Sequence, residues 1–266
     1  MYTKNKLREL IDNSKKIRRD IIKISHLKKI SHLASSLSCV EILTFVYSQL
    51  LTKYKNSTFI LSKGHAASAL YNTLYNFRLM SKKVLDSYNN NGSILAEHPP
   101  AHGKIKNIFC ATGSLGHGMP IAAGLATSKK ILKQKGLVIA LVSDGECNEG
   151  SIWETAMYAS KKELNNFITF IDFNKWQATG RSKDILNLDK LDIRWKSFGW
   201  DCLNINGHDY GQFFHVEKKI HNLKKPLVII CNTIKGKGVS FMEDNNNWHY
   251  RIPDKKELYD ALEQLR

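Results

Sequence analysis

Residues 137–176 read LVIALVSDGECNEGSIWETAMYASKKELNNFITFIDFNKW. An uninterrupted apolar run over 137–142 ends at a Ser-Asp-Gly turn, a helix-length segment follows from about Ser151, and a second apolar run occupies 167–172. Strands without polar alternation, joined by helix-length crossovers, are typical of a parallel sheet that is covered on both faces. This unit therefore predicts an α/β fold, with a parallel sheet and helices on both faces.

The rest of the chain extends the same plan. Helical spacing of apolar residues predicts a helix over 5–30, and Ser38-x-x-Glu41 predicts a capping box at the start of another helix. A short strand at 59–61 should end in a glycine turn and lead into a helix, whereas residues 90–118, rich in Asn, Gly, Pro and His, should form long loops. Further strands are expected near 201–205 and 227–231.

The composition limits the classes of function. The chain of 266 residues is 42% hydrophobic and 24% charged, without a repeat or linker, so we expect one folded domain over residues 1–266. A net charge of +16 would favour nucleic acid or an anionic membrane if it were clustered, but the lysines are dispersed, so we expect neither partner. The first residues do not resemble a secretory signal, and no apolar run is long enough to span a membrane. Five scattered cysteines without a C-x-x-C pair favour a reducing cytoplasm.

Polar residues follow two of the predicted strands, at the point where each strand ends. Asp144 and Gly145 follow the first strand, and Asn174 follows the second. Ligands bind at the carboxyl ends of parallel strands, so the Asp144 carboxylate and the Asn174 carboxamide are candidate ligands of one hard cation such as Mg²⁺. Gly145 would let the backbone approach phosphate groups. Taken alone, the pattern is explained at least as well by a turn aspartate and a turn asparagine, which are both common.

The residues around this pattern resemble a known family. Residues 144–154, DGECNEGSIWE, and 171–180, IDFNKWQATG, closely resemble the thiamine diphosphate motif of transketolases. Further segments resemble the family in the same order: SHLASSLS at 31–38, SKGH at 62–65, HP at 98–99, TGSLGHG at 112–118, KGKG at 235–238, and His249. The resemblance covers nearly the whole chain. It implies the parallel α/β domain that binds the diphosphate of thiamine diphosphate in transketolases.

The resemblance also implies roles for individual residues. The metal ligands would be Asp144, Asn174 and the carbonyl of Trp176, with Mg²⁺ as the cation and Ca²⁺ or Mn²⁺ as alternatives. The cofactor-binding residues would be His65, Gly116, His117, Gly145, Glu149, Asn174 and Lys235. The catalytic residues at the entrance of the site would be His32, His98 and His249. They would contact donor hydroxyls or assist proton transfer, a role that suits histidine near neutral pH.

Simpler interpretations stay open for several residues. An isolated histidine is more often a helix cap or a solvent-facing loop residue than a ligand. Two prolines between His98 and His102 forbid the helix that would make them a zinc-binding pair. Ser151-x-x-Glu154 has the pattern of a helix capping box, so we interpret Glu154 as structural.

Other positions bear on the detailed geometry. Trp153 and Trp176 are at least as well explained by core packing as by cofactor contacts. The family usually has Gly where this chain has Ser143, and Gly residues beside the first histidine, where this chain has Ser31 and Ala34. If these positions require a positive φ, the backbone should be strained there.

Full-length relatives in this family carry a second domain that holds the aminopyrimidine ring and supplies an activating glutamate, and we expect this chain to lack it. We therefore expect a C-terminal-type partner subunit, with two copies of each chain in an α2β2 heterotetramer. The expected reaction is transfer of a two-carbon ketol unit from a ketose to an aldose, with either free or phosphorylated sugars. The alternatives are a component of another thiamine diphosphate enzyme of the 2-oxo acid dehydrogenase type, a non-catalytic cofactor-binding module, and a nucleic-acid binder, which the dispersed lysines disfavour.

Overall fold

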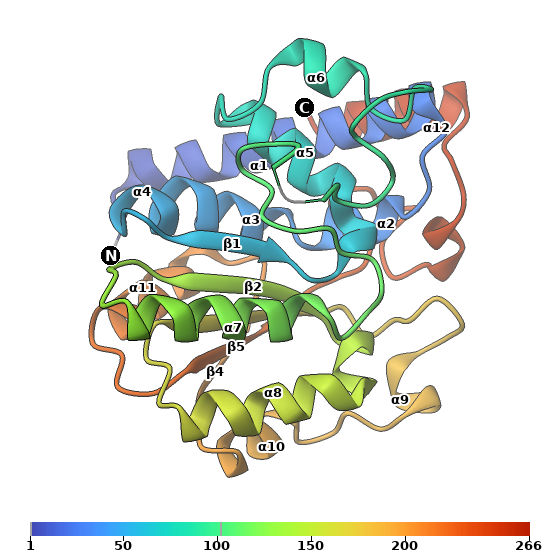
Figure 1. The fold of residues 1–266 in the computed structure, drawn as a ribbon. Helices are drawn as coiled ribbons and strands as arrows, with labels where there is room; N and C mark the ends of the chain where they lie inside the picture. The colour runs from blue at the N-terminus through green and yellow to red at the C-terminus, as the bar shows by residue number, and fades with distance from the viewer. Residues whose placement is uncertain (1, 102) are drawn as a thin grey trace.

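Five parallel strands lie at the centre of the fold in a computed structural model, which describes residues 2–101 and 103–266 (Figure 1). Within these residues the strands are β1 (Thr58–Leu61), β2 (Val138–Ser143), β3 (Phe167–Phe173), β4 (Asp201–Asn206) and β5 (Leu227–Asn232). They form one sheet in the order β1-β2-β3-β5-β4, with every neighbouring pair parallel. The predicted strands and their parallel arrangement are confirmed. His102, weighed above as a zinc ligand, lies outside the described residues.

The register of the strands aligns their carboxyl ends along one edge of the sheet. Leu61, the last residue of β1, pairs with Leu141 of β2, and Ser143 at the end of β2 pairs with Asp172 of β3. The last residues of β3 and β5 pair with each other as well. The segments that follow these strands therefore leave the sheet at the same edge, which is where the predicted site residues lie.

Helices cover both faces of the sheet, as predicted (Figure 1). One side holds α1 (Lys4–Lys28), α3 (Val40–Phe45), α5 (Ala67–Asn76), α11 (Tyr210–His221) and α12 (Lys255–Gln264). The other side holds α7 (Gly118–Ile131), α8 (Gly150–Lys161) and α10 (Leu191–Ser197). Shorter elements are α2 (Leu33–Ser38), η1 (Val46–Leu50, a π-helical turn), α4 (Leu51–Lys53), η2 (Gly64–Ala66), α6 (Lys82–Asp86), η3 (Gly145–Asn148), α9 (Ser182–Ile185) and η4 (Asn246–His249).

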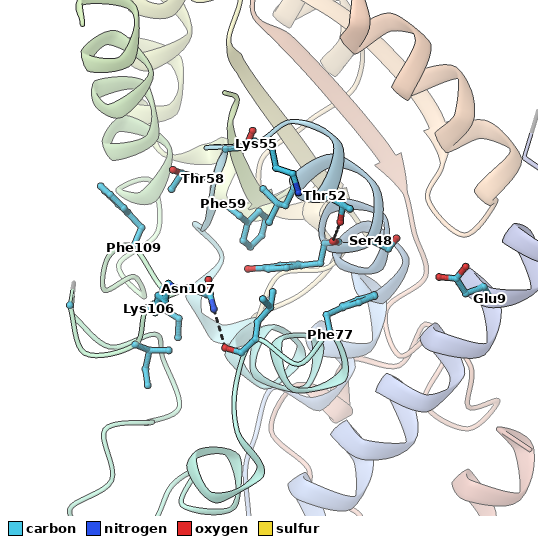
Figure 2. Close-up of a pocket in the computed structure, with 17 residues that line it drawn as sticks. Glu9, Ser48, Thr52, Lys55, Thr58, Phe59, Phe77, Lys106, Asn107 and Phe109 are labelled. Atoms are coloured by element: carbon cyan, nitrogen blue, oxygen red, sulfur yellow. Dashed lines mark hydrogen bonds between the residues drawn. The ribbon is translucent and has the colours of Figure 1, made fainter. Parts of the chain in front are cut away.

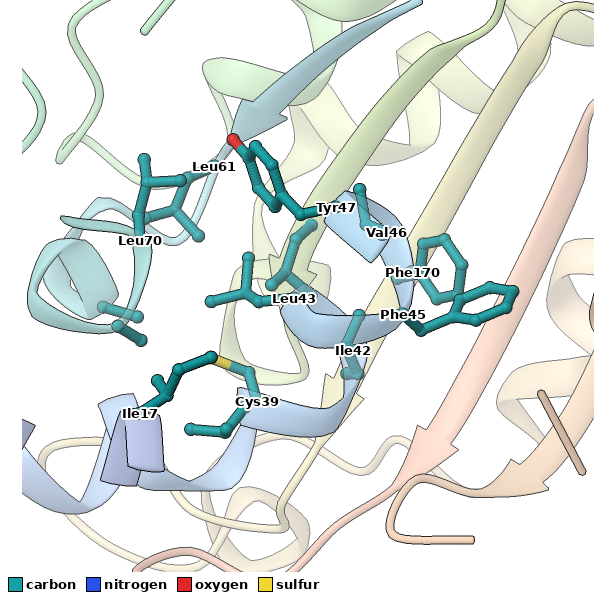
Figure 3. Close-up of a cluster of buried hydrophobic side chains, with 14 of the residues drawn as sticks. Ile17, Cys39, Ile42, Leu43, Phe45, Val46, Tyr47, Leu61, Leu70 and Phe170 are labelled. Atoms are coloured by element: carbon teal, nitrogen blue, oxygen red, sulfur yellow. The ribbon is translucent and has the colours of Figure 1, made fainter. Parts of the chain in front are cut away.

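The side chains of the central strands alternate between two apolar cores. In β2, Ile139 and Leu141 belong to the core under α1 and α5. Val138, Ala140 and Val142, which alternate with them, belong to the core under α7 and α8. Phe45 of α3 packs edge-on against Phe170 of β3, with ring centroids 6.3 Å apart (Figure 3). Because both faces are buried, the strands need apolar residues at every position, which explains the unbroken runs in the sequence.

The two predicted capping boxes are wrong. Ser38 is the last residue of α2, and its hydroxyl donates to Asp172 Oδ2 (2.6 Å) instead of capping the next helix. Glu41 instead accepts two hydrogen bonds from Arg18 (2.6 Å each). In α8 the N-cap residue makes no side-chain capping bond, and the Ser151 hydroxyl donates to the carbonyl of another loop. In each case a tertiary partner replaces the local one.

A cavity of about 750 Å³ lies at the opposite edge of the sheet from the predicted site (Figure 2). Thr58, the first residue of β1, and Phe59 line it together with Phe77 and Lys106. None of the residues predicted above to bind metal, cofactor or substrate lines this cavity. Across residues 2–101 and 103–266, no helix combines the length and the apolar character needed to cross a membrane.

Candidate active site

The carboxylate of Asp144 lies directly after β2 and is fully buried. Its Oδ2 accepts a hydrogen bond from the Ser182 hydroxyl (2.7 Å), whereas its Oδ1 is buried without a hydrogen-bond partner among the described residues. Burial raises the pKa of Asp144 to about 7. A buried carboxylate oxygen that lacks a donor is costly to leave unpaired, and it fits the requirement for a cation ligand.

Asn174 follows the neighbouring strand β3, and its carboxamide is held in one orientation. Its Oδ1 accepts from the backbone N–H of Trp176 (3.0 Å), and its Nδ2 donates to Asp172 Oδ2 (3.0 Å). Ser182, which bonds Asp144, also donates its backbone N–H to the carbonyl of Lys175 (3.0 Å). The structure therefore brings the segment with Asn174 and Trp176 over Asp144. Oxygens of a carboxylate, an amide and a carbonyl suit Mg²⁺, so the residues present fit the predicted cation.

A buried ion pair between Lys63 and Asp172 lies beneath these residues, and both side chains are 0% exposed. Lys63 Nζ donates to Asp172 Oδ2 (2.5 Å) and to the carbonyl of Ser35 (3.0 Å). Burial alone would raise the pKa of Asp172, but the Lys63 ammonium and the donors around the carboxylate hold it below its usual value. Sequence reasoning gave no role to either residue, although both lie in the motifs quoted above.

Four histidine rings gather near this buried pair. The His32 ring centroid lies 4.9 Å from that of His249, 5.7 Å from that of His65 and 5.9 Å from that of His98. Burial lowers the pKa of His32, and it lowers the pKa of His65 well below its usual value. Burial and the charge of Lys235 lower the pKa of His249 to about 3. At neutral pH these three imidazoles are therefore neutral, and each can donate through one nitrogen and accept through the other.

Lys235 fixes which nitrogen of His249 carries the proton. Lys235 Nζ lies 3.0 Å from His249 Nδ1 and 2.6 Å from Asn246 Oδ1. Burial and the charge of Lys63 lower the pKa of Lys235 to about 8, so the ammonium form predominates at pH 7. Because the ammonium can only donate, Nδ1 of His249 must accept, and its proton sits on Nε2.

The predicted cofactor residues Gly116, His117 and Glu149 lie where α7 and α8 begin. The Gly116 N–H donates to Glu146 Oε1 (2.9 Å), which also accepts from the hydroxyl of Ser62. Glu146 is fully buried, and burial raises its pKa to about 7. His117 and Glu149 are exposed and make no side-chain capping bond to the helices that they precede. Glu146 therefore holds the loop of Gly116 in place through these hydrogen bonds. It was not among the residues predicted from the sequence.

Two predictions about local geometry have clear outcomes. No strain arises at Ser31, Ala34 or Ser143, because none of them has a positive φ; His32 itself has φ 59°. Trp153 packs beside Trp195 with ring centroids 5.3 Å apart, as core packing predicts.

The remaining positions are Gly145 and Trp176. A Cβ on Gly145 would lie 2.9 Å from the Gln177 side chain, so this glycine permits close packing of the two loops. Trp176 is only partly buried and stacks on Arg181, so it is not a core residue. In the part of the chain that the structure describes, no group of three or more His, Cys, Asp or Glu side chains could hold a metal. The predicted set depends instead on amide and carbonyl oxygens beside Asp144.

Comparisons with known proteins found similarity over most of the chain. Residues 13–258 match the family model described as transketolase, thiamine diphosphate binding domain. One of the apulose-4-phosphate transketolase subunits of Phocaeicola vulgatus is 34% identical over 260 residues, which are 95% of this chain and 92% of that protein. The 6-deoxy-6-sulfo-D-fructose transketolase subunit SqwG of Clostridium sp. (strain MSTE9) is 35% identical over 222 residues, 80% of each chain.

Longer proteins match over part of their length. The crystal structure of transketolase from Campylobacter jejuni superposes with a TM-score of 0.87 at 24% identity, covering 99% of this chain and 43% of that one. Human transketolase is 30% identical over 260 residues, which are 92% of this chain and 40% of the human protein. The chain thus spans about two fifths of these longer proteins.

Proposed function

Since this chain belongs to the family of transketolase thiamine diphosphate-binding domains, we propose that it is the N-terminal subunit of a two-subunit transketolase and binds the diphosphate end of the cofactor. The buried, unpartnered Oδ1 of Asp144, which follows the strand next to that of the fixed Asn174 carboxamide, is the observation that carries this proposal. The family match makes a thiamine diphosphate transferase the first candidate. The alternatives are a component of a 2-oxo acid dehydrogenase and a non-catalytic cofactor-binding module.

The cation of this site is proposed to be Mg²⁺, held by Asp144, Asn174 and the carbonyl of Trp176, with Ca²⁺ or Mn²⁺ as substitutes. Gly145 and the loop of Gly116 would contact the diphosphate. The thiamine ring, when bound, supplies the carbon nucleophile and electron sink of ketol transfer. The residues of this chain bind the diphosphate, orient the cofactor and exclude water.

The histidine cluster is proposed to handle the sugar. His32, His98 and His249 would hydrogen-bond donor hydroxyls or assist proton transfer as the carbon–carbon bond is cleaved or formed. His249 presents Nε2–H because Lys235 occupies its other nitrogen. Neutral His32 can accept a proton from a hydroxyl, whereas His249 can only donate a hydrogen bond from Nε2.

The partner is proposed to be a C-terminal-type subunit that supplies the aminopyrimidine site, in an α2β2 assembly. Support comes from relatives that are themselves named as transketolase subunits and whose lengths this chain nearly matches, and from the much longer single-chain transketolases. The substrates are proposed to be a ketose donor and an aldose acceptor. The cytoplasmic location stays a prediction from the sequence.

The test is Mg²⁺-dependent binding of thiamine diphosphate, measured by calorimetry on this chain together with its C-terminal-type partner. Wild type should bind only with Mg²⁺, and Asp144→Ala should abolish binding. Asp192→Ala is the matched control, because this aspartate lies in α10 and forms an exposed ion pair with Lys196. Binding without ketol transfer from any ketose would favour the non-catalytic module. No binding by wild type would refute the proposal.

A further inference from the structure

Residues 174–182 form a short hairpin that carries the proposed metal-binding carbonyl. Trp176 and Arg181 are bridged in antiparallel fashion, and the Gln177 N–H donates to the Gly180 carbonyl (2.8 Å). The base of the hairpin is fixed to the buried site by Asn174, which accepts from the Trp176 N–H, and by the bond from Ser182 to Asp144 described above. The Trp176 carbonyl therefore belongs to an element with its own tertiary support.

The outer side of the hairpin is held by Asp244, from the loop before η4. Arg181 donates to both oxygens of Asp244 (2.7 and 2.5 Å), and Trp176 Nε1 donates to its Oδ1 (2.8 Å). The guanidinium carbon of Arg181 also lies 3.8 Å from the centre of the Trp176 ring. The planar Arg181 guanidinium bonds the carboxylate at two points and stacks on the Trp176 indole, so it fixes the orientation of both side chains. A lysine ammonium cannot make these two contacts.

The same loop reaches the histidine cluster. Asn246 donates to the Ala178 carbonyl at the tip of the hairpin (3.0 Å), and its Oδ1 accepts from Lys235 Nζ (2.6 Å). The backbone N–H of Asp244 donates to the Lys235 carbonyl (2.8 Å). Lys235 in turn bonds His249. Asn246 thus links the hairpin to Lys235 and His249.

We propose that Arg181 and Asp244 are positioning residues that hold the Trp176 carbonyl against the cation and keep the hairpin in register with His249. This inference rests on the proposed function. The side chains are partly exposed, at 32% for Arg181 and 54% for Asp244. A pair this exposed adds little to global stability, so its effect should appear in the geometry of the site.

The experiment uses Arg181→Lys and Asp244→Asn in the complex of this chain with its partner. Both variants should weaken Mg²⁺ affinity, measured at saturating thiamine diphosphate, by about three- to tenfold. Arg181→Lys loses the bidentate and stacked contacts, and Asp244→Asn loses one acceptor of the bidentate contact. The urea midpoint should stay unchanged. Asp86→Asn is the matched control, since it removes one charge from the exposed ion pair with Lys82 and should leave Mg²⁺ affinity unchanged.

Hydrogen exchange of the backbone amides of residues 175–182, without cofactor, gives a second readout that needs no catalysis. Arg181→Lys and Asp244→Asn should speed this exchange, and the control should not. Unchanged Mg²⁺ affinity in both variants would overturn the inference even if the hairpin amides exchanged faster. The Arg181–Asp244 pair would then hold the hairpin to the neighbouring loop without affecting the metal site. If wild type fails to bind Mg²⁺ and thiamine diphosphate, the proposed function fails, and the metal-positioning role fails with it. If wild type binds and the variants bind equally well, only this inference fails.

Discussion

Replacing Lys63 by methionine tests the buried ion pair beneath the site. Methionine keeps the length and the apolar part of the side chain but removes the charge, so Asp172 is left buried without its cation. Breaking a buried pair costs about 3–5 kcal/mol. Asp172 keeps its hydrogen bonds from Ser38 (2.6 Å), Asn174 (3.0 Å) and Thr233, so we expect the lower end, about 3 kcal/mol.

Urea unfolding followed by circular dichroism measures this loss. With a slope of about 3 kcal/mol per molar urea for a chain of this size, the midpoint should fall by about 1 M. The double variant Lys63→Met/Asp172→Asn removes both charges and should recover about 2 kcal/mol of the loss. Lys82→Met, at the exposed ion pair of α6, is the control and should shift the midpoint by less than about 0.2 M.

The pH dependence gives the sign of the effect. In wild type the pKa of Asp172 is held low, so its contribution to stability is present above the unfolded pKa and is lost as pH falls through the folded pKa. In Lys63→Met, burial is no longer offset and raises the pKa of Asp172. The deficit relative to wild type should therefore be largest at pH 7 and shrink toward pH 4–5. An equal midpoint for Lys63→Met and wild type, or no recovery in the double variant, would refute this reasoning.

Three further predictions concern residues of the same site. The pKa of Lys235 is about 8 in the folded protein, below its unfolded value. Between pH 7.5 and 9.5 the unfolding free energy of wild type should therefore rise by about 2 kcal/mol relative to that of Lys235→Met. If the difference in unfolding free energy between the two proteins does not change with pH, the assignment is contradicted. Gly116→Ala should destabilise by about 2 kcal/mol in thermal unfolding, because φ is +81° and the new Cβ would lie 2.5 Å from Ser151 Oγ; an unchanged melting temperature would show that the loop relaxes freely. Glu146→Ala should cost about 2–3 kcal/mol by leaving buried donors unpaired, whereas Glu146→Gln should cost about 1 kcal/mol; equal urea midpoints for the two variants would argue against its role as an acceptor.

Sequence reasoning was most successful where the signal is local. Unbroken apolar runs predicted β1, β2, β3 and β5, whereas β4 was expected in a mixed stretch near 201–205. The Asn- and Gly-rich stretch predicted the loops, since residues 90–101 and 103–117 contain no helix or strand. Helix α7 was not predicted, because Ala and Gly lie on several of its faces and weaken the helical period. The motif resemblance named residues that the structure does bring together, including the four histidines, and their roles stay predictions.

The supporting contacts could not be predicted in the same way. Lys63 bonds Asp172 across 109 residues of sequence, and Ser62 bonds Glu146 across 84, so no short window contains both partners. Lysine and glutamate are also rarely buried, so Lys63 and Glu146 would both be expected at exposed positions. Ser38 failed as a helix cap for a related reason: Asp172, which became its partner, is 134 residues away.

The strand order also bears on how the chain is made on the ribosome. Strand β5 lies between β3 and β4, although β4 is synthesised first. One lateral edge of β3 and the whole of β4 therefore wait for Leu227–Asn232. At the usual rate of translation this wait is about 3–12 s for β3 and about 1–5 s for β4. During that interval the nascent chain presents an open apolar edge, which is a target for chaperones and for mispairing. The carboxyl end of the sheet, where the proposed catalytic site lies, is therefore complete only after β5 has joined β3 and β4.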